Sequence, residues 1–338
     1  MKAVAYKKPG PLTDPDALID ITLPEPVATG HDLLVEVKAV SVNPVDYKVR
    51  SGSAPFDGEE YRILGWDAAG VVKAVGPEVT LFQPGDEVFY AGSLVRQGTN
   101  AELHLVDERI VGHKPKSLDF VAAAALPLTS LTAWELLFDR LGVKPGKPVD
   151  AGSLLIVGAA GGVGSILTQI ARRLTGLTVI GTASRPETQA WVREQGAHHV
   201  IDHAKPLPEQ MKAIGIPEAR YIASLTATEQ HYPALVDVLA PQGHLGIIDD
   251  PRSLDATRLK RKSAALHWEL MFTRSLYTTP DIVAQHIILD EIAGLVDAGI
   301  IRSTAAHSFG VINAANLRQA HELLESGRSH GKIVLAGF

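Results

Sequence analysis

The hydrophobic positions in the middle of the chain predict a strand, a helix and a second strand in close succession. Leu154 to Val157 form a short uninterrupted apolar run, which is typical of a strand buried on both faces of a parallel sheet. Apolar residues then recur at helical spacing from Val163 to Leu174, with Arg172 and Arg173 on the opposite face. Residues 178–181 supply the next strand, so the segment has the order and length of a right-handed βαβ unit.

The pattern on either side of this unit is different. From residue 1 to about 110, short β-type runs alternate with Pro and Gly turns, which predicts a compact and mainly antiparallel module. Residues 118–142 have the pattern of a helix, and a polar segment rich in Pro and Gly follows them. After about residue 268, helical stretches lead to a final strand, KIVLAGF, with no partner nearby in the sequence. We expect this strand to return to the first module.

Composition narrows the class of protein. With 338 residues, of which 46% are hydrophobic, the chain is long enough for two domains or one large one. The 32 Lys and Arg residues against 38 Asp and Glu give a net charge of -6, which argues against nucleic acid or an anionic membrane as a partner. No apolar run approaches the roughly 18 residues of a membrane span, and the start lacks the apolar core of a signal peptide. We therefore expect a cytoplasmic protein.

The turn between the predicted strand and helix reads GAAGGVGS. Ala159, Gly161 and Gly164 occupy the three positions of the G-x-G-x-x-G fingerprint, with alanine in the first. Small residues let the backbone approach a pyrophosphate, whose charge is met by exposed N–H groups and the helix dipole. A glycine cluster alone could be a bare turn, but here both flanking strands and the helix are present. The sequence therefore predicts a dinucleotide site contacted by Ala160, Gly161, Gly162, Val163 and Gly164.

The end of the second strand bears on which dinucleotide is bound. Sites for NAD commonly place Asp or Glu there, whereas this chain has Ser184 and Arg185. A hydroxyl and a guanidinium suit a ribose 2'-phosphate, which a carboxylate would repel, so we predict NADPH. Ser184 and Glu187 also have the spacing of a capping box at a helix start, and the two roles are compatible.

Several motifs together resemble the medium-chain dehydrogenase/reductase superfamily, on its zinc-free, quinone oxidoreductase-like side, near proteins labelled zinc-type alcohol dehydrogenase-like. They are SVNPVDYKVRSG, LGWDAAGVV, VGPEVTLFQPGDEVFY, AALPLTSLTAWELL, GAAGGVGS, VIDH and GKIVLAGF. The resemblance implies an α/β protein with a GroES-like, mainly antiparallel catalytic domain (1–126 and 268–338) and a Rossmann domain with a doubly wound parallel sheet (127–267). The active site would lie in the cleft between the domains, and we expect a homodimer.

Two positions depart from the zinc alcohol dehydrogenases. Those enzymes carry a Cys ligand where this chain has Asn43 and a His ligand where it has Trp66, and the chain contains no cysteine. The lobe that holds their second zinc is also missing. We therefore expect no metal site.

Without a Lewis acid, simple alcohol oxidation has no evident means of charge stabilisation. Hydride from NADPH can instead add to a quinone or an α,β-unsaturated carbonyl, because the resulting enolate is delocalised. We therefore expect an NADPH-dependent, zinc-independent reductase of such small molecules. The alternative is an NADPH-binding protein with a structural or regulatory role and little catalysis.

The resemblance also implies roles for residues near the nicotinamide. Asn43 would lie beside its ribose. Lys48 would hold ribose hydroxyls or donate to the product oxygen, the alternative being an exposed lysine at a strand end. Tyr47 would form a pocket wall, or else belong to the core. Thr129 and Thr132 would approach the nicotinamide, although threonines inside a helix can also bond to their own backbone.

The remaining predicted residues follow strands of the nucleotide domain. His203 takes the place of an aromatic residue that relatives often have near the adenosine phosphate, or is an ordinary histidine at a strand end. Leu225, Thr226, Gly246 and Ile247 fall at the ends of later strands, where an open sheet presents its loops to the cofactor. We expect loops such as 51–61 and 265–277 to form the walls of the acceptor pocket.

Overall fold

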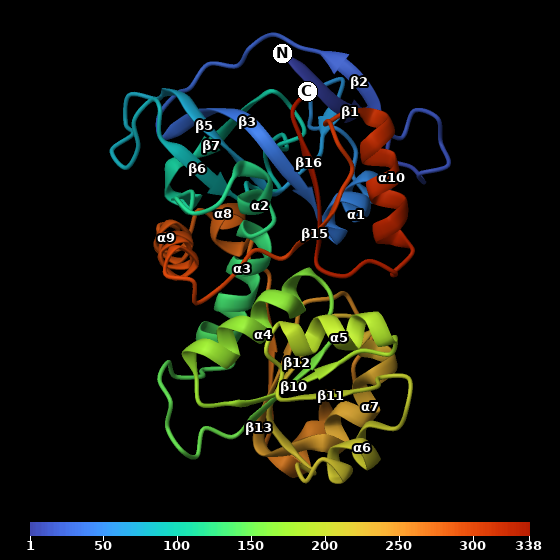
Figure 1. Ribbon diagram of the computed structural model, residues 1–338. Coiled ribbons are helices and arrows are strands. Elements are labelled where there is room, and N and C mark those ends of the chain that lie inside the picture. The colour runs from blue at the N-terminus through green and yellow to red at the C-terminus, as the bar shows by residue number, and fades with distance from the viewer. The chain divides into compact units, whose positions relative to one another are not determined.

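The structure is a computed structural model that describes residues 1–338 and divides them into two compact units (Figure 1). Unit 1 comprises Met1–Leu131 and Phe272–Phe338, and unit 2 comprises Thr132–Met271. The boundaries expected from the sequence, 126/127 and 267/268, lie a few residues earlier. Unit 1 is thus built from both ends of the chain.

Unit 1 is mainly antiparallel, as predicted. Its strands are β1 (Lys2–Tyr6), β2 (Ile19–Thr22), β3 (Asp32–Val42), β4 (Arg62–Ile63), β5 (Ala68–Val75), β6 (Glu87–Tyr90), β7 (Leu103–Asp107), β8 (Val111–His113), β15 (Ala305–Ser308) and β16 (Lys332–Ala336). Its helices are α1 (Pro44–Gly52), η1 (Glu108–Ile110), α2 (Phe120–Ala124), most of α3 (Pro127–Trp134), α8 (Thr273–Tyr277), α9 (Ala284–Asp297) and α10 (Ala314–Glu325).

The long strand β3 organises the larger sheet of unit 1. A small sheet has the order β2-β1-β4, and a seven-stranded sheet has the order β15-β16-β3-β5-β6-β8, with β7 also pairing with β3. The final strand β16 lies antiparallel to β3, with Ile333 opposite Val42 (Figure 1). The predicted return of the C-terminal strand to the first module is therefore confirmed.

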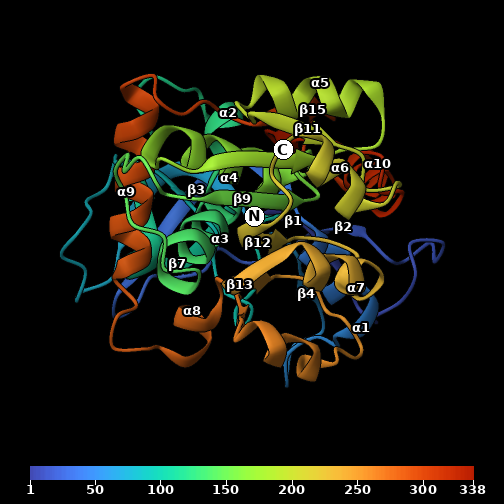
Figure 2. The same ribbon diagram turned by 90° about the horizontal axis from the view of Figure 1, so that it is seen from below.

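Unit 2 contains the predicted βαβ unit within a six-stranded parallel sheet of order β11-β10-β9-β12-β13-β14. The strands are β9 (Ser153–Val157), β10 (Thr178–Thr182), β11 (His199–Ile201), β12 (Ala219–Ser224), β13 (Leu239–Ile247) and β14 (Ala265–Trp268). The helices are α4 (Gly162–Leu174), α5 (Pro186–Glu194), α6 (Leu207–Ala213), α7 (Thr228–Val238), η2 (Glu135–Arg140) and η3 (Ala256–Lys262). Helices α4 and α5 cover one face of the sheet, and α6 and α7 cover the other (Figures 1 and 2).

The single helix predicted over residues 118–142 is wrong in detail. The segment forms α2, then α3, and then the π-helical turn η2. Pro127 separates α2 from α3, because proline has no N–H to continue the helical bonds of the preceding turn. None of the helices in the structure is both long and apolar enough to cross a membrane.

A buried ion pair joins the C-terminal strand to the rest of unit 1. Lys332, the first residue of β16, places Nζ 3.0 Å from Oδ2 of Asp67, which lies just before β5. The Lys332 side chain is 3% exposed and that of Asp67 is 0% exposed. Burying two charges is costly unless their remaining donors and acceptors are bonded.

Asp67 and Lys332 each form further hydrogen bonds within unit 1. Asp67 Oδ2 also accepts from the Ser41 hydroxyl at 2.9 Å and the Asn43 amide at 2.7 Å, while its Oδ1 accepts from the Leu128 N–H at 2.8 Å. Lys332 Nζ donates to the carbonyl oxygen of Val42 at 2.9 Å and to Asn43 Oδ1. The pair thus connects the end of β3, the start of α3 and the C-terminal strand.

Replacing Lys332 with Met should destabilise unit 1 by about 3–5 kcal/mol, because it leaves the Asp67 carboxylate buried without its counter-ion. Urea unfolding of the variant and the unaltered protein, followed by circular dichroism, measures this difference. The matched control is Lys73→Met, which removes the exposed ion pair with Glu25 and should change stability little. Equal destabilisation by the two substitutions would contradict the importance of the buried pair.

Candidate functional site

The glycine-rich turn of unit 2 joins β9 to α4 as predicted. Gly161 is the N-cap of α4, and its N–H donates to the Gly158 carbonyl oxygen at 3.1 Å. Ala160, Gly161, Gly162 and Val163 are partly exposed, whereas Gly164 is buried. The first N–H groups of α4 therefore lie at an open helix N-terminus, where an anionic group is favoured.

Three of the four glycines of this turn, Gly158, Gly161 and Gly164, serve different purposes. Gly158 has a φ of +82°, which favours glycine, and a Cβ there would lie 2.9 Å from the Thr226 side chain. At Gly164 a Cβ would lie 2.4 Å from the carbonyl oxygen of Gly158, so this glycine is needed for contact between helix and turn. At Gly161 a Cβ would meet a single atom, that same oxygen, at an ordinary 3.5 Å. Packing within the protein therefore explains Gly158 and Gly164 but leaves the space at Gly161 open.

Ser184 and Arg185 lie two and three residues after the end of β10, and Ser184 is exposed. The predicted capping box of Ser184 and Glu187 is wrong, because α5 begins at Pro186 with Arg185 as its N-cap. The Arg185 N–H donates to the Thr188 hydroxyl at 3.3 Å, and the Arg185 side chain pairs with Glu187 at 2.7 Å. The helix starts one residue later than predicted because proline has the fixed φ that suits the first helical position.

His203 lies at the same edge of the sheet, two residues after β11. Its Nδ1 is 3.2 Å from the hydroxyl of Thr182, and that hydroxyl also accepts from the Gly158 N–H at 3.2 Å. Leu225 and Thr226 follow β12, and the Leu225 N–H donates to the carbonyl oxygen of Val157 at 3.2 Å. The structure thus gathers these predicted residues around the carboxyl ends of β9 to β12.

Gly246 and Ile247 are at the end of β13, as predicted, but both are buried. A Cβ at Gly246 would lie 2.5 Å from the Leu136 side chain, and the Ile247 side chain belongs to the apolar core of unit 2. Packing accounts for both residue types, so a contact with a cofactor there would involve their backbone.

The remaining predicted residues belong to unit 1 or the helix α3. Thr129 and Thr132 are buried on α3, and the Thr129 hydroxyl donates to the carbonyl oxygen of Leu126 at 3.2 Å. This is the backbone bond that threonines inside a helix commonly form. Because the hydroxyl hydrogen is used in this bond, the Thr129 side chain would contact a ligand by accepting a hydrogen bond on its oxygen.

Helix α1 carries the predicted catalytic residues. Lys48 is exposed and Tyr47 is half-buried, and both lie on this helix, so the description of Lys48 as a strand-end lysine is wrong. Asp46 caps the helix start, because its Oδ2 accepts from the Asn43 N–H at 2.8 Å. Burial raises the pKa of Asp46 to about 7, and its Oδ1 has no hydrogen-bond partner. Helix α1 thus holds a buried carboxyl group one residue before Tyr47.

The two positions that carry zinc ligands in the zinc alcohol dehydrogenases are occupied by residues bonded within the protein. Asn43 is 2% exposed, and its amide is bonded to Asp67 and Lys332. Trp66 is fully buried and donates its indole N–H to the carbonyl oxygen of Ser93 at 3.1 Å. An indole N–H has no lone pair for a metal, and the Asn43 oxygen already accepts from an ammonium. These residues do not fit zinc, and no group of three His, Asp or Glu residues elsewhere is arranged to hold a metal ion.

The sequence does not predict the buried ion pair between Lys332 and Asp67 that holds Asn43. Lys332 and Asp67 lie in the quoted motifs GKIVLAGF and LGWDAAGVV, but nothing in the sequence pairs them, because they are separated by most of the chain. The available signal was a charged residue in each of two otherwise apolar segments. Such residues are rarely buried without a partner, so each one indicates that a partner of opposite charge lies nearby in the fold.

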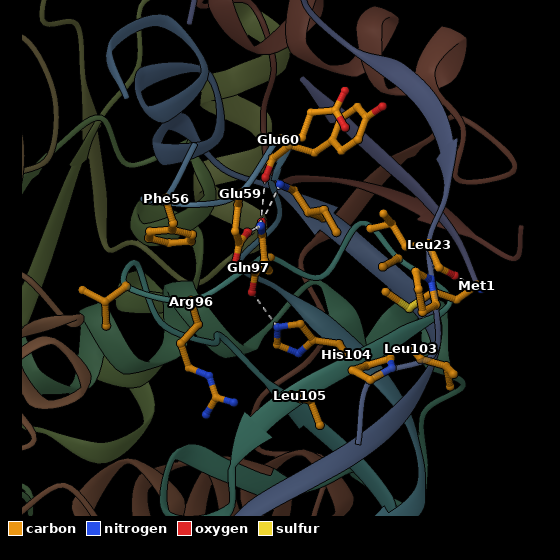
Figure 3. A pocket seen from close by; sticks show the side chains of 17 residues that line it. Met1, Leu23, Phe56, Glu59, Glu60, Arg96, Gln97, Leu103, His104 and Leu105 are labelled. Atoms are coloured by element: carbon orange, nitrogen blue, oxygen red, sulfur yellow. Dashed lines mark hydrogen bonds between the residues drawn. The ribbon is translucent and has the colours of Figure 1, made fainter. Parts of the chain in front are cut away.

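A cavity of about 790 Å³ in unit 1 contains none of the predicted site residues (Figure 3). Phe56, Glu59, Glu60 and Tyr61 of the predicted loop 51–61 line it, together with residues of β7 and the N-terminal segment. Its lining is mostly apolar, and its charged side chains are paired within the protein, as in the Glu60 pair with Lys7 at 2.6 Å. The loop does line a cavity, but none of the lining residues belongs to α1.

Two family models match the chain. The model described as alcohol dehydrogenase GroES-like domain matches residues 29–116, and the model described as zinc-binding dehydrogenase matches residues 195–335. The first range lies within unit 1. The second begins just before β11, covers the rest of unit 2 and continues through the C-terminal part of unit 1 into β16.

Similar proteins cover the whole chain. A zinc-type alcohol dehydrogenase-like protein from Staphylococcus aureus is 41% identical over 337 residues, covering 99% of both chains. The crystal structure of a putative zinc-dependent alcohol dehydrogenase from Rhizobium etli is 58% identical, with a TM-score of 0.96, covering 100% of this chain and 98% of that one. The structure of Escherichia coli quinone oxidoreductase complexed with NADPH is 25% identical, with a TM-score of 0.84, covering 99% and 100%. On this evidence the chain belongs to the medium-chain dehydrogenase/reductase superfamily and is an oxidoreductase of that superfamily.

Proposed function

We propose that the protein is an NADPH-dependent, zinc-independent reductase that transfers hydride to a quinone or an α,β-unsaturated carbonyl compound. The observation that carries the proposal is that Asn43 and Trp66, at the positions of the zinc ligands, are hydrogen-bonded within the protein. The Asn43 amide is held by Lys332 and Asp67, and the Trp66 indole is a donor engaged with Ser93. The residues at these two positions thus have no free lone pair to hold a Lewis-acid metal ion, which favours an acceptor that delocalises its own charge.

The cofactor would be held mainly by the turn before α4 and the residues after β10. The open space at Gly161 and the N–H groups at the start of α4 suit a pyrophosphate. Ser184, Arg185 and His203 suit the 2'-phosphate of NADPH. Asn43, Lys48, Thr129, Thr132, Leu225 and Thr226, with the backbone of Gly246 and Ile247, would face the nicotinamide half.

The protein's own residues must orient the acceptor and meet the charge that develops on it. When bound, the reduced nicotinamide supplies a hydride. As the electron-poor carbon accepts it, the π electrons of the acceptor move onto oxygen, which then needs a donor and a proton. Lys48 extends from α1 as an exposed ammonium and is the donor that we propose for this oxygen. Tyr47, half-buried beside it, would form a wall of the acceptor site.

The proposal includes a homodimer and a cytoplasmic location. Strand β14 is the outer strand of the parallel sheet, and Trp268 and Leu270 at its end are about half exposed. An unpaired strand edge with exposed apolar side chains is a common surface for pairing with a second copy. The location rests on the sequence alone.

Purified protein should oxidise NADPH faster than NADH with quinones and enones, and slowly or not at all with simple aldehydes. The activity should survive strong chelators, and elemental analysis should find no stoichiometric zinc. Absorbance at the reduced nicotinamide band measures the turnover. One zinc per chain, with activity lost on chelation and restored by zinc, would overturn the metal-free mechanism. Tight NADPH binding without turnover of any acceptor would instead favour a structural or regulatory role.

Replacing Lys48 with Ala should lower kcat with an enone by about ten- to a thousandfold if its ammonium stabilises the oxygen or relays a proton. Steady-state kinetics with the acceptor and NADPH varied separately tests this. Lys48→Arg keeps the positive charge and should retain more of kcat than Ala does. A rise in the KM for NADPH with kcat unchanged would show that Lys48 only holds the cofactor.

Replacing Gly161 with Val should abolish NADPH binding with little change in the melting temperature, because the space it fills is open in the protein. Gly164→Val is the contrasting variant and should unfold or fail to express, since its side chain would strike the backbone of the turn. Fluorescence titration and thermal melting measure the two effects. Unchanged NADPH affinity in Gly161→Val would mean that the cofactor does not approach this turn.

A further inference from the structure

Helix α1, which carries the proposed donor Lys48, contains no fully buried apolar side chain. Among its residues, Pro44–Gly52, the buried side chains are those of Asp46 and Arg50. These two lie four residues apart and so share one face of the helix, whereas Lys48, two residues from each, lies on the opposite face and is exposed. A helix this short depends on tertiary contacts for its stability. The orientation of α1 therefore depends on what its two buried charged side chains contact.

Three acceptors bind the guanidinium of Arg50. Its Nη2 donates to Glu325 Oε1 at 2.8 Å, and its Nη1 donates to His321 Nδ1 at 3.0 Å. Its Nε donates to the carbonyl oxygen of Gly10 at 3.4 Å, and the Gly10 N–H donates to the Arg50 carbonyl oxygen at 3.0 Å. The Arg50 side chain is 1% exposed, so these groups replace the water that would otherwise surround the charge.

The contact with Arg50 sets the tautomer of His321. Because arginine has donors only, His321 must accept at Nδ1 and carry its proton at Nε2. Burial, and then the positive charges of Arg50 and Arg318, lower the pKa of His321 to about 3, so the ring stays neutral. Its Nε2 is buried and has no hydrogen-bond partner. The bond to Arg50 is therefore the one hydrogen bond that this side chain forms within the protein.

His321 and Glu325 belong to α10, a helix that is itself fixed to the start of the chain. Arg318 on α10 donates to the carbonyl oxygens of Leu12 at 2.6 Å and Pro15 at 2.7 Å. Helices α10 and α1 lie side by side in unit 1 (Figure 1). Helix α10 thus supports α1 from the side on which Arg50 is buried, and the opposite side carries Lys48.

We propose that His321 and Glu325 are positioning residues for the reduction: by holding Arg50 they set the orientation of α1 and with it the place of the Lys48 ammonium. The inference rests on the proposed role of Lys48 as the donor to the acceptor oxygen. It adds two residues of the C-terminal helix that act through Arg50 and do not themselves touch the acceptor.

The size of the effect follows from the geometry of the helix. Because the Lys48 ammonium lies at the end of a long side chain, a small rotation of α1 about its axis moves this group further than it moves the backbone. A displacement of about 1 Å of a group that acts in the reaction can lower the rate by about a hundredfold. Loss of one of the acceptors of Arg50 should therefore affect kcat even though the residue removed lies on another helix.

The test compares His321→Leu, which removes the acceptor for Arg50, with His321→Asn, whose side-chain oxygen can take the place of Nδ1. In steady-state assays with NADPH and an enone, His321→Leu should lower kcat by about three- to thirtyfold, and His321→Asn should retain most of it. Glu325→Leu, at a side chain that is 35% exposed, should also lower kcat and replaces His321→Leu if that variant does not fold. Glu322→Leu, at an exposed position of the same helix, is the matched control and should leave kcat unchanged. Circular dichroism at the assay temperature checks that each variant is folded.

Combining these substitutions with Lys48→Ala separates positioning from general damage to unit 1. If His321 and Glu325 act through Lys48, His321→Leu or Glu325→Leu should lower kcat no further once the Lys48 ammonium is absent. An equal loss in both backgrounds, or no loss in the folded single variants, would overturn the inference while leaving Lys48 as the donor. An unchanged kcat in Lys48→Ala alone would overturn the proposed donor itself.

Discussion

Burying a carboxylate and an ammonium together is tolerated only where their other donors and acceptors are also satisfied, and the Asp67–Lys332 pair meets this condition. Five further bonds reach it from Ser41, Val42, Asn43 and Leu128, with Asn43 contributing through both ends of its amide. Ser41 and Val42 end β3, Asn43 precedes α1 and Leu128 lies in α3, whereas Lys332 begins β16 near the other end of the chain. The pair therefore fixes how the two chain segments of unit 1 meet.

The same pair defines the environment of Asn43. Its amide donates to a carboxylate and accepts from an ammonium, so its orientation is set by charge rather than by packing alone. Asn43 in turn anchors the start of α1, because its N–H is capped by Asp46. Tyr47 and Lys48 follow on that helix, so the position of the proposed proton donor depends on the buried ion pair through Asn43.

In unit 2 the decisive constraint is steric. Gly158 and Gly164 are explained by backbone conformation and by close contact between turn and helix, and neither requires a ligand. Gly161 differs, because the protein leaves the adjacent space unfilled. Packing thus accounts for Gly158 and Gly164 but not for Gly161, a distinction that the spacing of the motif does not make.

The sequence by itself determined the βαβ unit of unit 2 and the return of the final strand, because apolar periodicity and a strand without a nearby partner reflect burial directly. It also identified Ser184 and Arg185 at the end of β10, but not the helix cap, which Pro186 moved by one residue. The alternative that Lys48 lies at a strand end is wrong, because the N-P-x-D segment forms a capped helix. Only the tertiary structure paired Asp67 with Lys332 and brought His321 to Arg50, because side chains far apart in sequence leave no local pattern. Such pairings depend on the register of strands and the placement of loops, and those are decided when the whole chain packs.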